Sequence, residues 1–167
     1  LLGRKTLVSC TPKGVLRILD YYKIDTEGKN VVIIGRSNIV GKPMASLLIR
    51  KDRNATVTIC HTGTINLKEI TLKADIIIVA VGAVNTLTSD MVKDGAIVID
   101  VGITRVPDSS KKSGYAIKGD ADYEGLFNKV KAITPVPGGC GLMTVAMLME
   151  NTLEAAMERE GLCEGDL

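Results

Sequence analysis

The chain has 167 residues, of which 46% are hydrophobic and 24% charged, and its formal net charge is +2. This length suits one domain with a sizeable core, whereas the small scattered charge, the 3% aromatic content and the lack of Trp argue against a nucleic-acid-binding surface. The longest apolar run, residues 74–84, is about half of the ~20 residues that a membrane span requires, so we expect neither nucleic acid nor membrane as a partner.

Helices and apolar strands are predicted to alternate along the chain. Thr11 is expected to cap a helix that begins at Pro12 and runs to Tyr22. The further predicted elements are strand 31–34, helix 44–50, strand 56–60, helix 67–73, strand 75–81, a helical turn over 87–92, strand 96–101, a surface loop over 107–114, a short strand 115–118, a last parallel strand 130–134 and an amphipathic helix over 145–157.

Continuous apolar strands separated by helices are typical of a parallel sheet covered on both faces. The predicted fold class is therefore α/β, a Rossmann-like three-layer αβα domain with a mostly parallel sheet. Since the sequence shows neither an internal repeat nor a linker, residues 1–167 are predicted to form one domain.

The most informative segment is VVIIGRSNIVGKP, residues 31–43. A short apolar run stops at Gly35, and Gly41 opens an apparent helix, which is the strand–turn–helix unit of a dinucleotide-binding fold. A helix N-terminus offers unpaired N–H donors to a pyrophosphate where no side chain intrudes. Ser37 replaces the middle glycine of the usual G-x-G-x-x-G pattern, so a glycine turn without a ligand remains an alternative for this motif alone.

The second strand bears on the choice of cofactor. In NAD-binding units an acidic residue at its end accepts hydrogen bonds from the adenosine ribose, but residues 60–64 here are Cys-His-Thr-Gly-Thr. A 2′-phosphate would meet hydroxyl groups there, and Arg36 could pair with it, so NADP is favoured and NAD stays possible. The alternative is that Arg36 is a solvated turn residue and Thr62 caps the next helix. His61, at a strand end, is expected to be structural.

The four cysteines, at positions 10, 60, 140 and 163, form no C-x-x-C pair, and the chain has one histidine. We therefore expect no metal site and no disulfide framework, and a reducing, cytoplasmic location. The chain begins Leu-Leu-Gly, from which we expect a fragment of a longer protein.

Further motifs follow the later strands, where open parallel sheets bind ligands. In chain order the informative segments are CTPKG from Cys10, GRSNIVGKP from Gly35, CHT from Cys60, ADIIIVAVG from Ala74, VIDVGI from Val98, Gly119-Asp120 and TPVPGG from Thr134. Together they closely resemble the C-terminal cofactor domain of methylenetetrahydrofolate dehydrogenase/methenyltetrahydrofolate cyclohydrolase, in that family's order and spacing and over nearly the whole chain.

The resemblance implies a bifunctional enzyme of one-carbon metabolism. Methylenetetrahydrofolate would lose a hydride to the nicotinamide, and water would open the methenyl product to 10-formyltetrahydrofolate. It implies a cofactor site in which Gly35, Arg36 and Ser37 hold phosphates and ribose, residues from Thr62 to Thr64 lie near the adenosine 2′ position, and Ile103 touches the nicotinamide end. The residues implied to border the folate are Pro137, Gly138, Gly139 and Thr144.

The sequence also departs from the family pattern. Gly63 stands where many members carry a basic residue, Leu142 replaces a proline, and Cys140 replaces a valine. The family's acid–base lysine lies four residues after a tyrosine in the preceding domain, and this chain has no Tyr-x-x-x-Lys. We therefore predict no catalytic residue here and expect the N-terminal folate-binding domain to be missing.

The resemblance leaves two other functions open. One is an NAD-dependent, monofunctional methylenetetrahydrofolate dehydrogenase, and the other is a non-catalytic dinucleotide-binding module. Under the main interpretation the tetrahydrofolate substrate would bind through the missing domain, the parent enzyme would be a homodimer, and the chain alone would bind the dinucleotide without catalysing either step.

Overall fold

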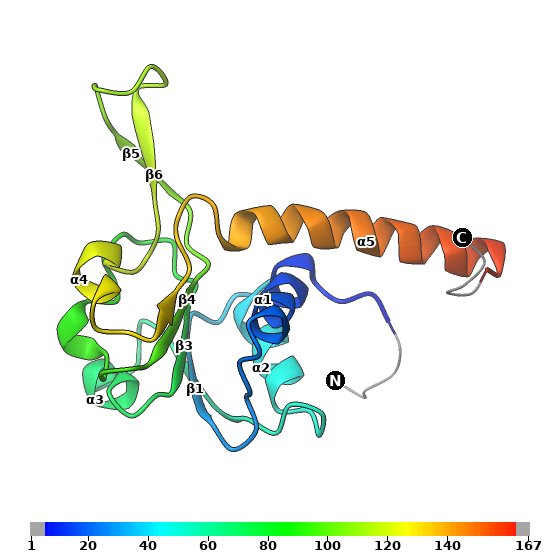
Figure 1. The fold of residues 1–167 in the computed structure, drawn as a ribbon, viewed down its shortest axis with the longest axis horizontal. Helices are drawn as coiled ribbons and strands as arrows, with labels where there is room; N and C mark the ends of the chain where they lie inside the picture. Colours follow the sequence, from blue (N-terminus) through cyan, green and yellow to red (C-terminus); the bar gives the residue numbers. More distant parts are fainter. Residues whose placement is uncertain (1–5, 163–167) are drawn as a thin grey trace.

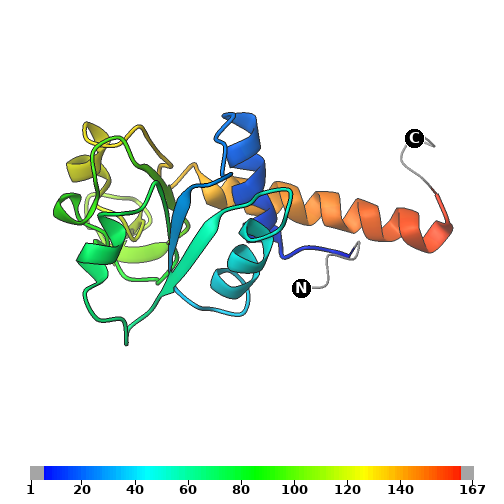
Figure 2. The same cartoon turned by 90° about the horizontal axis from the view of Figure 1, so that it is seen from below.

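The computed structural model describes residues 6–162. Five parallel strands form one sheet in the order β2-β1-β3-β4-β7, and helices lie on both of its faces (Figures 1 and 2). This confirms the predicted α/β, Rossmann-like three-layer class. The strands are β1 (Asn30–Ile34), β2 (Thr56–Cys60), β3 (Ile76–Val79), β4 (Ile97–Asp100) and β7 (Ala132–Ile133).

The central strands are buried on both faces, as their continuous apolar sequences predict. All four residues of β3 are buried, and their side chains alternate between two hydrophobic clusters because successive residues of a strand point to opposite faces. Ile76 and Ile78 pack with α1 (Cys10–Tyr21) and α2 (Gly41–Leu48). Ile77 and Val79 belong to the cluster on the other face, which α3 (Leu67–Thr71), the 3-10 turn η1 (Ser89–Met91) and α4 (Tyr123–Phe127) cover.

The strand order creates a switch point between β1 and β3. The chain leaves β1 toward β2 on one side and returns to β3 on the other side, and ligands of open α/β sheets bind beyond the carboxyl ends of the strands at such a point. Ile34 is paired with both Cys60 and Val79, so the loops that follow β1, β2 and β3 leave the sheet side by side. We call this end of the sheet the carboxyl edge.

An antiparallel hairpin projects from the carboxyl edge (Figure 1). It consists of β5 (Thr104–Pro107) and β6 (Tyr115–Lys118), with Thr104 opposite Lys118. The sequence predicted the second strand and the loop between them but not β5, because the segment TRVP carries no apolar run. The predicted elements also omitted α4, which is a single short turn of helix.

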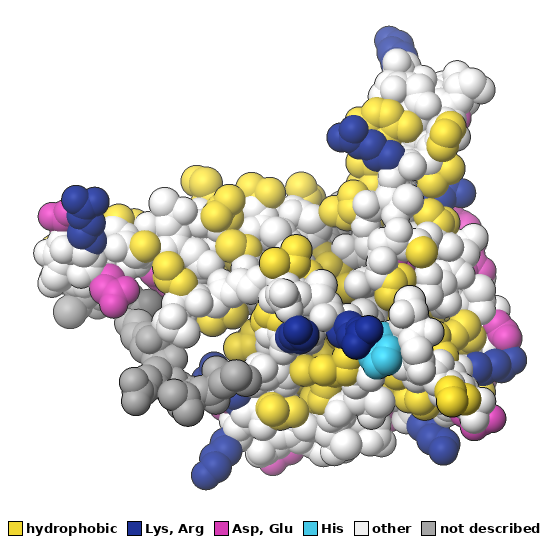
Figure 3. Space-filling model, turned by 180° about the vertical axis from the view of Figure 1, so that it is seen from behind, with side chains coloured by type: hydrophobic (Ala, Val, Ile, Leu, Met, Phe, Trp, Pro, Cys, Tyr) yellow, Lys and Arg dark blue, Asp and Glu magenta, His cyan; other side chains and the backbone are white. Residues whose placement is uncertain are grey.

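The last helix, α5 (Cys140–Glu160), is longer than the predicted amphipathic stretch. It begins directly after the glycines of the TPVPGG segment and runs along α1, with Met147 and Asn151 buried. Its other side stays exposed, as at Val145 (60%) and Met149 (70%), and forms part of a row of hydrophobic side chains along the helix in Figure 3. None of the helices within residues 6–162 is long and apolar enough to cross a membrane.

The start of α1 differs by two residues from its prediction. The helix begins at Cys10, with Ser9 as its N-cap residue, and no side chain caps it. Thr11 therefore lies inside the first turn, where its hydroxyl accepts a hydrogen bond from Thr144 of α5 at 3.1 Å. Pro12 remains tolerated there, because the first-turn amides of a helix have no intrahelical acceptor.

Candidate functional site

The turn after β1 brings two backbone segments into contact at its two glycines. Gly35 has φ +124°, and a Cβ atom there would lie 2.2 Å from the carbonyl oxygen of Ala80. A Cβ atom on Gly41 would lie 2.2 Å from the carbonyl oxygen of Gly35 and 2.8 Å from Cα of Arg36. Only glycine fits either position, so the start of α2 stays close to the end of β1 with a bare backbone surface, as a diphosphate site requires.

Ser37, which stands at the middle-glycine position of the G-x-G-x-x-G pattern, has a local structural role. Its hydroxyl oxygen accepts hydrogen bonds from the amides of Val40 (3.1 Å), the N-cap residue of α2, and Gly41 (3.4 Å), so it satisfies two backbone donors just before and at the start of the helix. Within the described chain, the amides of residues 36–39 have no protein acceptor. These donors, together with the positive end of the helix dipole, suit an anionic group.

The loop after β2 is a tight turn organised by the histidine. The amide of His61 donates to the Thr64 hydroxyl oxygen at 2.8 Å, and the amide of Gly63 donates to Nδ1 of His61 at 3.1 Å. Nδ1 is thus an acceptor, which places the proton of the neutral ring on Nε2. This geometry gives His61 a structural role in the turn.

The side chains of Arg36 and Thr62 are free toward solvent at this end of the sheet. Both are exposed, and neither side chain has a hydrogen-bond or ion-pair partner within residues 6–162. Figure 3 shows the single histidine beside basic side chains on this face of the molecule. The cationic surface and the lack of a carboxylate in residues 60–64 suit a phosphate group better than a bare ribose hydroxyl.

The predicted nicotinamide and folate residues lie farther along the same edge. Ile103 follows β4 and is 60% exposed, and its Cδ1 atom lies 3.4 Å from the position that a Cβ on Gly141 would take. The loops after β4 and β7 therefore meet at the start of α5. Pro137 and Gly138 are exposed in the second loop, and a Cβ on Gly139 would lie 2.5 Å from the carbonyl oxygen of Pro135.

Among the predicted folate residues, Thr144 has its side chain engaged within the protein. Its single hydroxyl proton is shared between two acceptors, the Thr11 hydroxyl oxygen (3.1 Å) and the carbonyl oxygen of Cys140 (2.9 Å). The first turn of α5 is thereby tied to the first turn of α1. Burial raises the pKa of the Cys140 thiol to about 11, so this cysteine is an uncharged packing residue at neutral pH.

Two buried carboxylates lie beneath the carboxyl edge, and the sequence analysis assigned them no role. Asp100, at the end of β4, accepts from the amides of Gly102 (2.8 Å), Asp120 (3.1 Å) and Ala121 (2.9 Å). Burial raises its pKa despite these bonds, and the neighbouring Asp120 carboxylate adds to the rise. The available signal was an acidic residue within two positions of a glycine in both VIDVG and KGDA.

Asp120 is fully buried and binds the loop that follows β3. Its Oδ2 accepts from the amides of Val81 (2.6 Å) and Gly82 (2.9 Å), whereas its Oδ1 has no partner. A Cβ on Gly102 would lie 2.2 Å from its Cγ. Glycine is therefore required at position 102 by the packing of this carboxylate.

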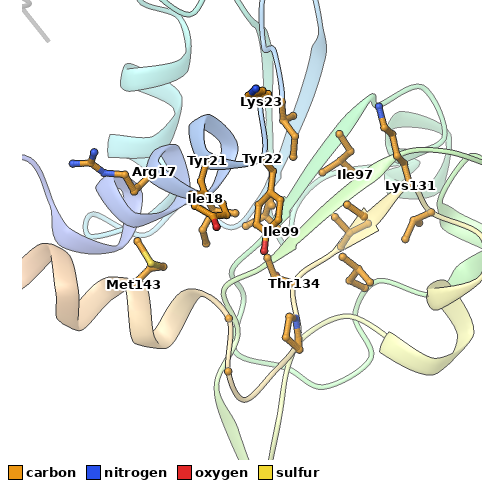
Figure 4. A pocket seen from close by; sticks show the side chains of 18 of the residues that line it. Arg17, Ile18, Tyr21, Tyr22, Lys23, Ile97, Ile99, Lys131, Thr134 and Met143 are labelled. Atoms are coloured by element: carbon orange, nitrogen blue, oxygen red, sulfur yellow. The ribbon is translucent and has the colours of Figure 1, made fainter.

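A cavity of about 1050 Å³ lies away from the predicted cofactor residues. Figure 4 shows around it side chains of α1 such as Ile18, of β4 such as Ile99, and of the segment after β7 such as Thr134. None of the six predicted cofactor residues lines it, and only Gly138 and Gly139 of the predicted folate residues do so. The cofactor residues instead line an open surface at the carboxyl edge.

Comparison with known protein families shows which family this chain belongs to. The family model described as "Tetrahydrofolate dehydrogenase/cyclohydrolase, NAD(P)-binding domain" matches residues 9–160. The chain belongs to this family. The matched residues include every predicted site residue of the tetrahydrofolate dehydrogenase/cyclohydrolase domain, together with Asp100 and Asp120.

Individual relatives agree with this membership. The chain is 57% identical over 155 residues to a bifunctional protein FolD of Chlorobium phaeobacteroides, which covers 92% of the chain and 52% of the relative. The solved FolD dehydrogenase/cyclohydrolase of Campylobacter jejuni matches with 54% identity and a TM-score of 0.83, over 91% of this chain and 51% of that one. The Trypanosoma brucei FolD, solved with NADP and an inhibitor, matches with 40% identity and a TM-score of 0.84, over 90% and 51%. The chain thus spans about half the length of the relatives it matches.

Proposed function

We propose that this chain is the cofactor-binding half of a bifunctional enzyme. That enzyme oxidises methylenetetrahydrofolate with NADP and hydrolyses the methenyl product to 10-formyltetrahydrofolate. The observation that carries the proposal is the family match over residues 9–160, combined with a glycine turn that leaves backbone amides free at the start of α2. The aligned residues cover 52% of the FolD relative from Chlorobium phaeobacteroides. The remaining half of such relatives supports a second, folate-binding domain in the parent enzyme.

We propose specific roles for the residues of the carboxyl edge. Gly35, Arg36 and Ser37 form the turn at the N-terminus of α2: Gly35 and Ser37 would hold the diphosphate and the adenosine ribose, and the Arg36 guanidinium would pair with the 2′-phosphate. Thr62 and Thr64 would lie at the 2′-phosphate, and Ile103 at the nicotinamide. Pro137, Gly138, Gly139 and Thr144 would border the folate. When bound, the dinucleotide supplies the hydride acceptor, and the chain's own residues orient it.

Cofactor choice gives the direct test of this site. Isothermal calorimetry on the purified chain is expected to show tighter binding of NADP than of NAD. Arg36→Ala should weaken NADP binding by ~1.5–3 kcal/mol, the range for a hydrogen bond to a charged group, and leave NAD binding nearly unchanged. Lys51→Ala, which removes an exposed cation beyond the far end of α2, is the matched control. Equal losses for both cofactors in Arg36→Ala would contradict the assignment.

Two alternatives are separated by measurements on the same chain. An NAD-dependent monofunctional dehydrogenase would bind NAD at least as tightly as NADP. A non-catalytic module would bind the dinucleotide but would not restore turnover when combined with a folate-binding domain of a relative. The main proposal predicts no turnover of methylenetetrahydrofolate by this chain alone, and turnover by it would refute that prediction.

We further propose that the parent enzyme is a cytoplasmic homodimer. Cys10, Cys60 and Cys140 are free thiols in the described part of the chain, which agrees with a reducing compartment. Light scattering of the enzyme at micromolar concentration checks the oligomeric state, and a monomer mass would contradict the dimer.

A further inference from the structure

The two buried carboxylates form one hydrogen-bonded unit beneath the carboxyl edge. Asp100 accepts from the amide of Asp120, so the two residues are joined directly. Asp100 also binds the amide of Gly102, and Asp120 binds those of Val81 and Gly82. Hydrogen bonds to a charged acceptor are about twice as strong as neutral ones, and here they attach three separate loops to one unit.

The loops held in this way leave the sheet next to each other. Strands β3 and β4 are paired with Val79 opposite Asp100. The residues that follow are Val81, whose side chain is 39% exposed, and Ile103, which is 60% exposed. Two apolar side chains therefore stand at the carboxyl edge on adjacent loops, and the carboxylates fix the backbone at or next to each of them.

We propose that Asp120, together with Asp100, is a positioning residue that holds Val81 and Ile103 as the two apolar walls of the nicotinamide subsite. This inference rests on the proposed function, because it assumes that the dinucleotide lies along the carboxyl edge. Its new content is the role of the buried carboxylates and of Val81. A flat, mostly apolar ring needs preformed walls, and walls on loops need an internal anchor to keep their separation.

The unpartnered oxygen of Asp120 makes a conservative substitution informative. Oδ2 alone carries both bonds to the β3 loop, and Oδ1 has no partner. In Asp120→Asn the amide oxygen can keep the two bonds, while the amide nitrogen takes the place of the oxygen that has none. In Asp120→Ala the amides of Val81 and Gly82 lose their acceptor, so the position of the Val81 side chain is no longer held.

The experiment compares two probes on the same chain. NADPH reports the whole site, and 2′,5′-ADP reports the adenosine half alone. NADPH is chosen over NADP because its ring is uncharged, so its binding measures placement of the ring rather than attraction to a carboxylate. Binding is followed by the fluorescence of NADPH, which no Trp in this chain obscures, and by calorimetry for 2′,5′-ADP.

We expect Asp120→Ala to weaken NADPH binding about tenfold, equal to about 1.4 kcal/mol, and to lose most of the NADPH fluorescence enhancement. Binding of 2′,5′-ADP should stay within about twofold, and Asp120→Asn should restore NADPH binding to near the wild-type level. Val81→Ala, which leaves the buried pair intact, should weaken NADPH binding in the same selective way. Ile49→Ala, an exposed apolar residue after α2, should change neither probe.

Four results separate the possibilities. Equal weakening of both probes in Asp120→Ala would show a general structural role and overturn the inference. Unchanged NADPH binding in Val81→Ala would also overturn it, even if Asp120→Ala failed to fold. If the wild-type chain bound neither probe, the proposed function itself would fail. If the wild-type chain bound both probes and the variants bound NADPH equally well, only the inference about Asp120 and Val81 would fail.

Discussion

Gly41 offers a substitution for which local and tertiary effects have opposite signs. Gly41 is the first residue of α2, and helix propensity by itself favours Ala over Gly by ~1 kcal/mol. In the folded chain, however, the new Cβ would lie 2.2 Å from the carbonyl oxygen of Gly35 and 2.8 Å from Cα of Arg36. Both contacts are with backbone, so no side chain can rotate away.

The magnitude follows from the size of this overlap. Ordinary Cβ contacts begin near 3.4 Å, so the start of α2 or the turn must move by about 1.2 Å. Overpacking of this kind costs typically ~1–3 kcal/mol and sometimes more. Because both overlaps are with backbone, we take the upper end of this range, about 3 kcal/mol. Subtracting the helix-propensity gain of ~1 kcal/mol, we expect Gly41→Ala to lower the free energy of unfolding by about 2 kcal/mol, a drop in Tm of about 4–8 °C for a domain of this size.

The matched control is Gly141→Ala, near the start of α5. Its Cβ would meet only the side chain of Ile103, at 3.4 Å, so the substitution should leave the Tm unchanged or raise it slightly. Thermal unfolding followed by circular dichroism compares the two variants, and calorimetry measures NADP binding, which Gly41→Ala should weaken at least tenfold. A Gly41→Ala variant as stable as the wild type, with unchanged NADP affinity, would refute the close approach on which the diphosphate site depends.

Two further predictions concern ionisation. The hydrogen bond from Lys93, with that from the amide of Asn30, lowers the pKa of Asp75. A lowered folded-state pKa stabilises the fold at pH values above the ordinary Asp range, and this stabilisation is lost as the pH falls through the folded-state pKa. Asp75→Asn should therefore destabilise the chain by about 0.5–1 kcal/mol at pH 7, a value reduced for the partial exposure of the pair. Urea unfolding at pH 7 and pH 3 checks this, and a difference that does not shrink at pH 3 would contradict it. Burial raises the pKa of the Cys60 and Cys140 thiols. Iodoacetamide at pH 8 should therefore leave both thiols unmodified in the folded chain and modify both in urea, as read out by peptide mass spectrometry. Rapid labelling of Cys140 in the folded chain would show that it is not packed as described.

Much of the site could be predicted because it lies at strand ends that are visible in the sequence. Residues 31–34 and 56–60 are apolar or β-branched runs bounded by turn residues, so the positions of Gly35 and of Thr62 at the carboxyl edge followed from local pattern. The hydrogen bonds that Ser37 accepts at the start of α2 could not be predicted, since they depend on the angle at which Val40 and Gly41 present their amides to the hydroxyl. The hairpin strand β5 was missed for a related reason, because its partner β6 stabilises a segment that has no strand pattern of its own.

The sequence by itself determined the fold class and the glycine turn, because both depend on properties of neighbouring residues: the apolar character of short runs, and the absence of a side chain where the backbone must turn. Only the tertiary structure decided how the carboxyl edge is held together. Asp120 binds amides 38 and 39 positions earlier in the chain, and such contacts exist only after the strand order has brought β3 beside β4. Hydrogen bonds between residues so far apart leave no periodic signal in the sequence, since each depends on the placement of whole strands rather than on its neighbours.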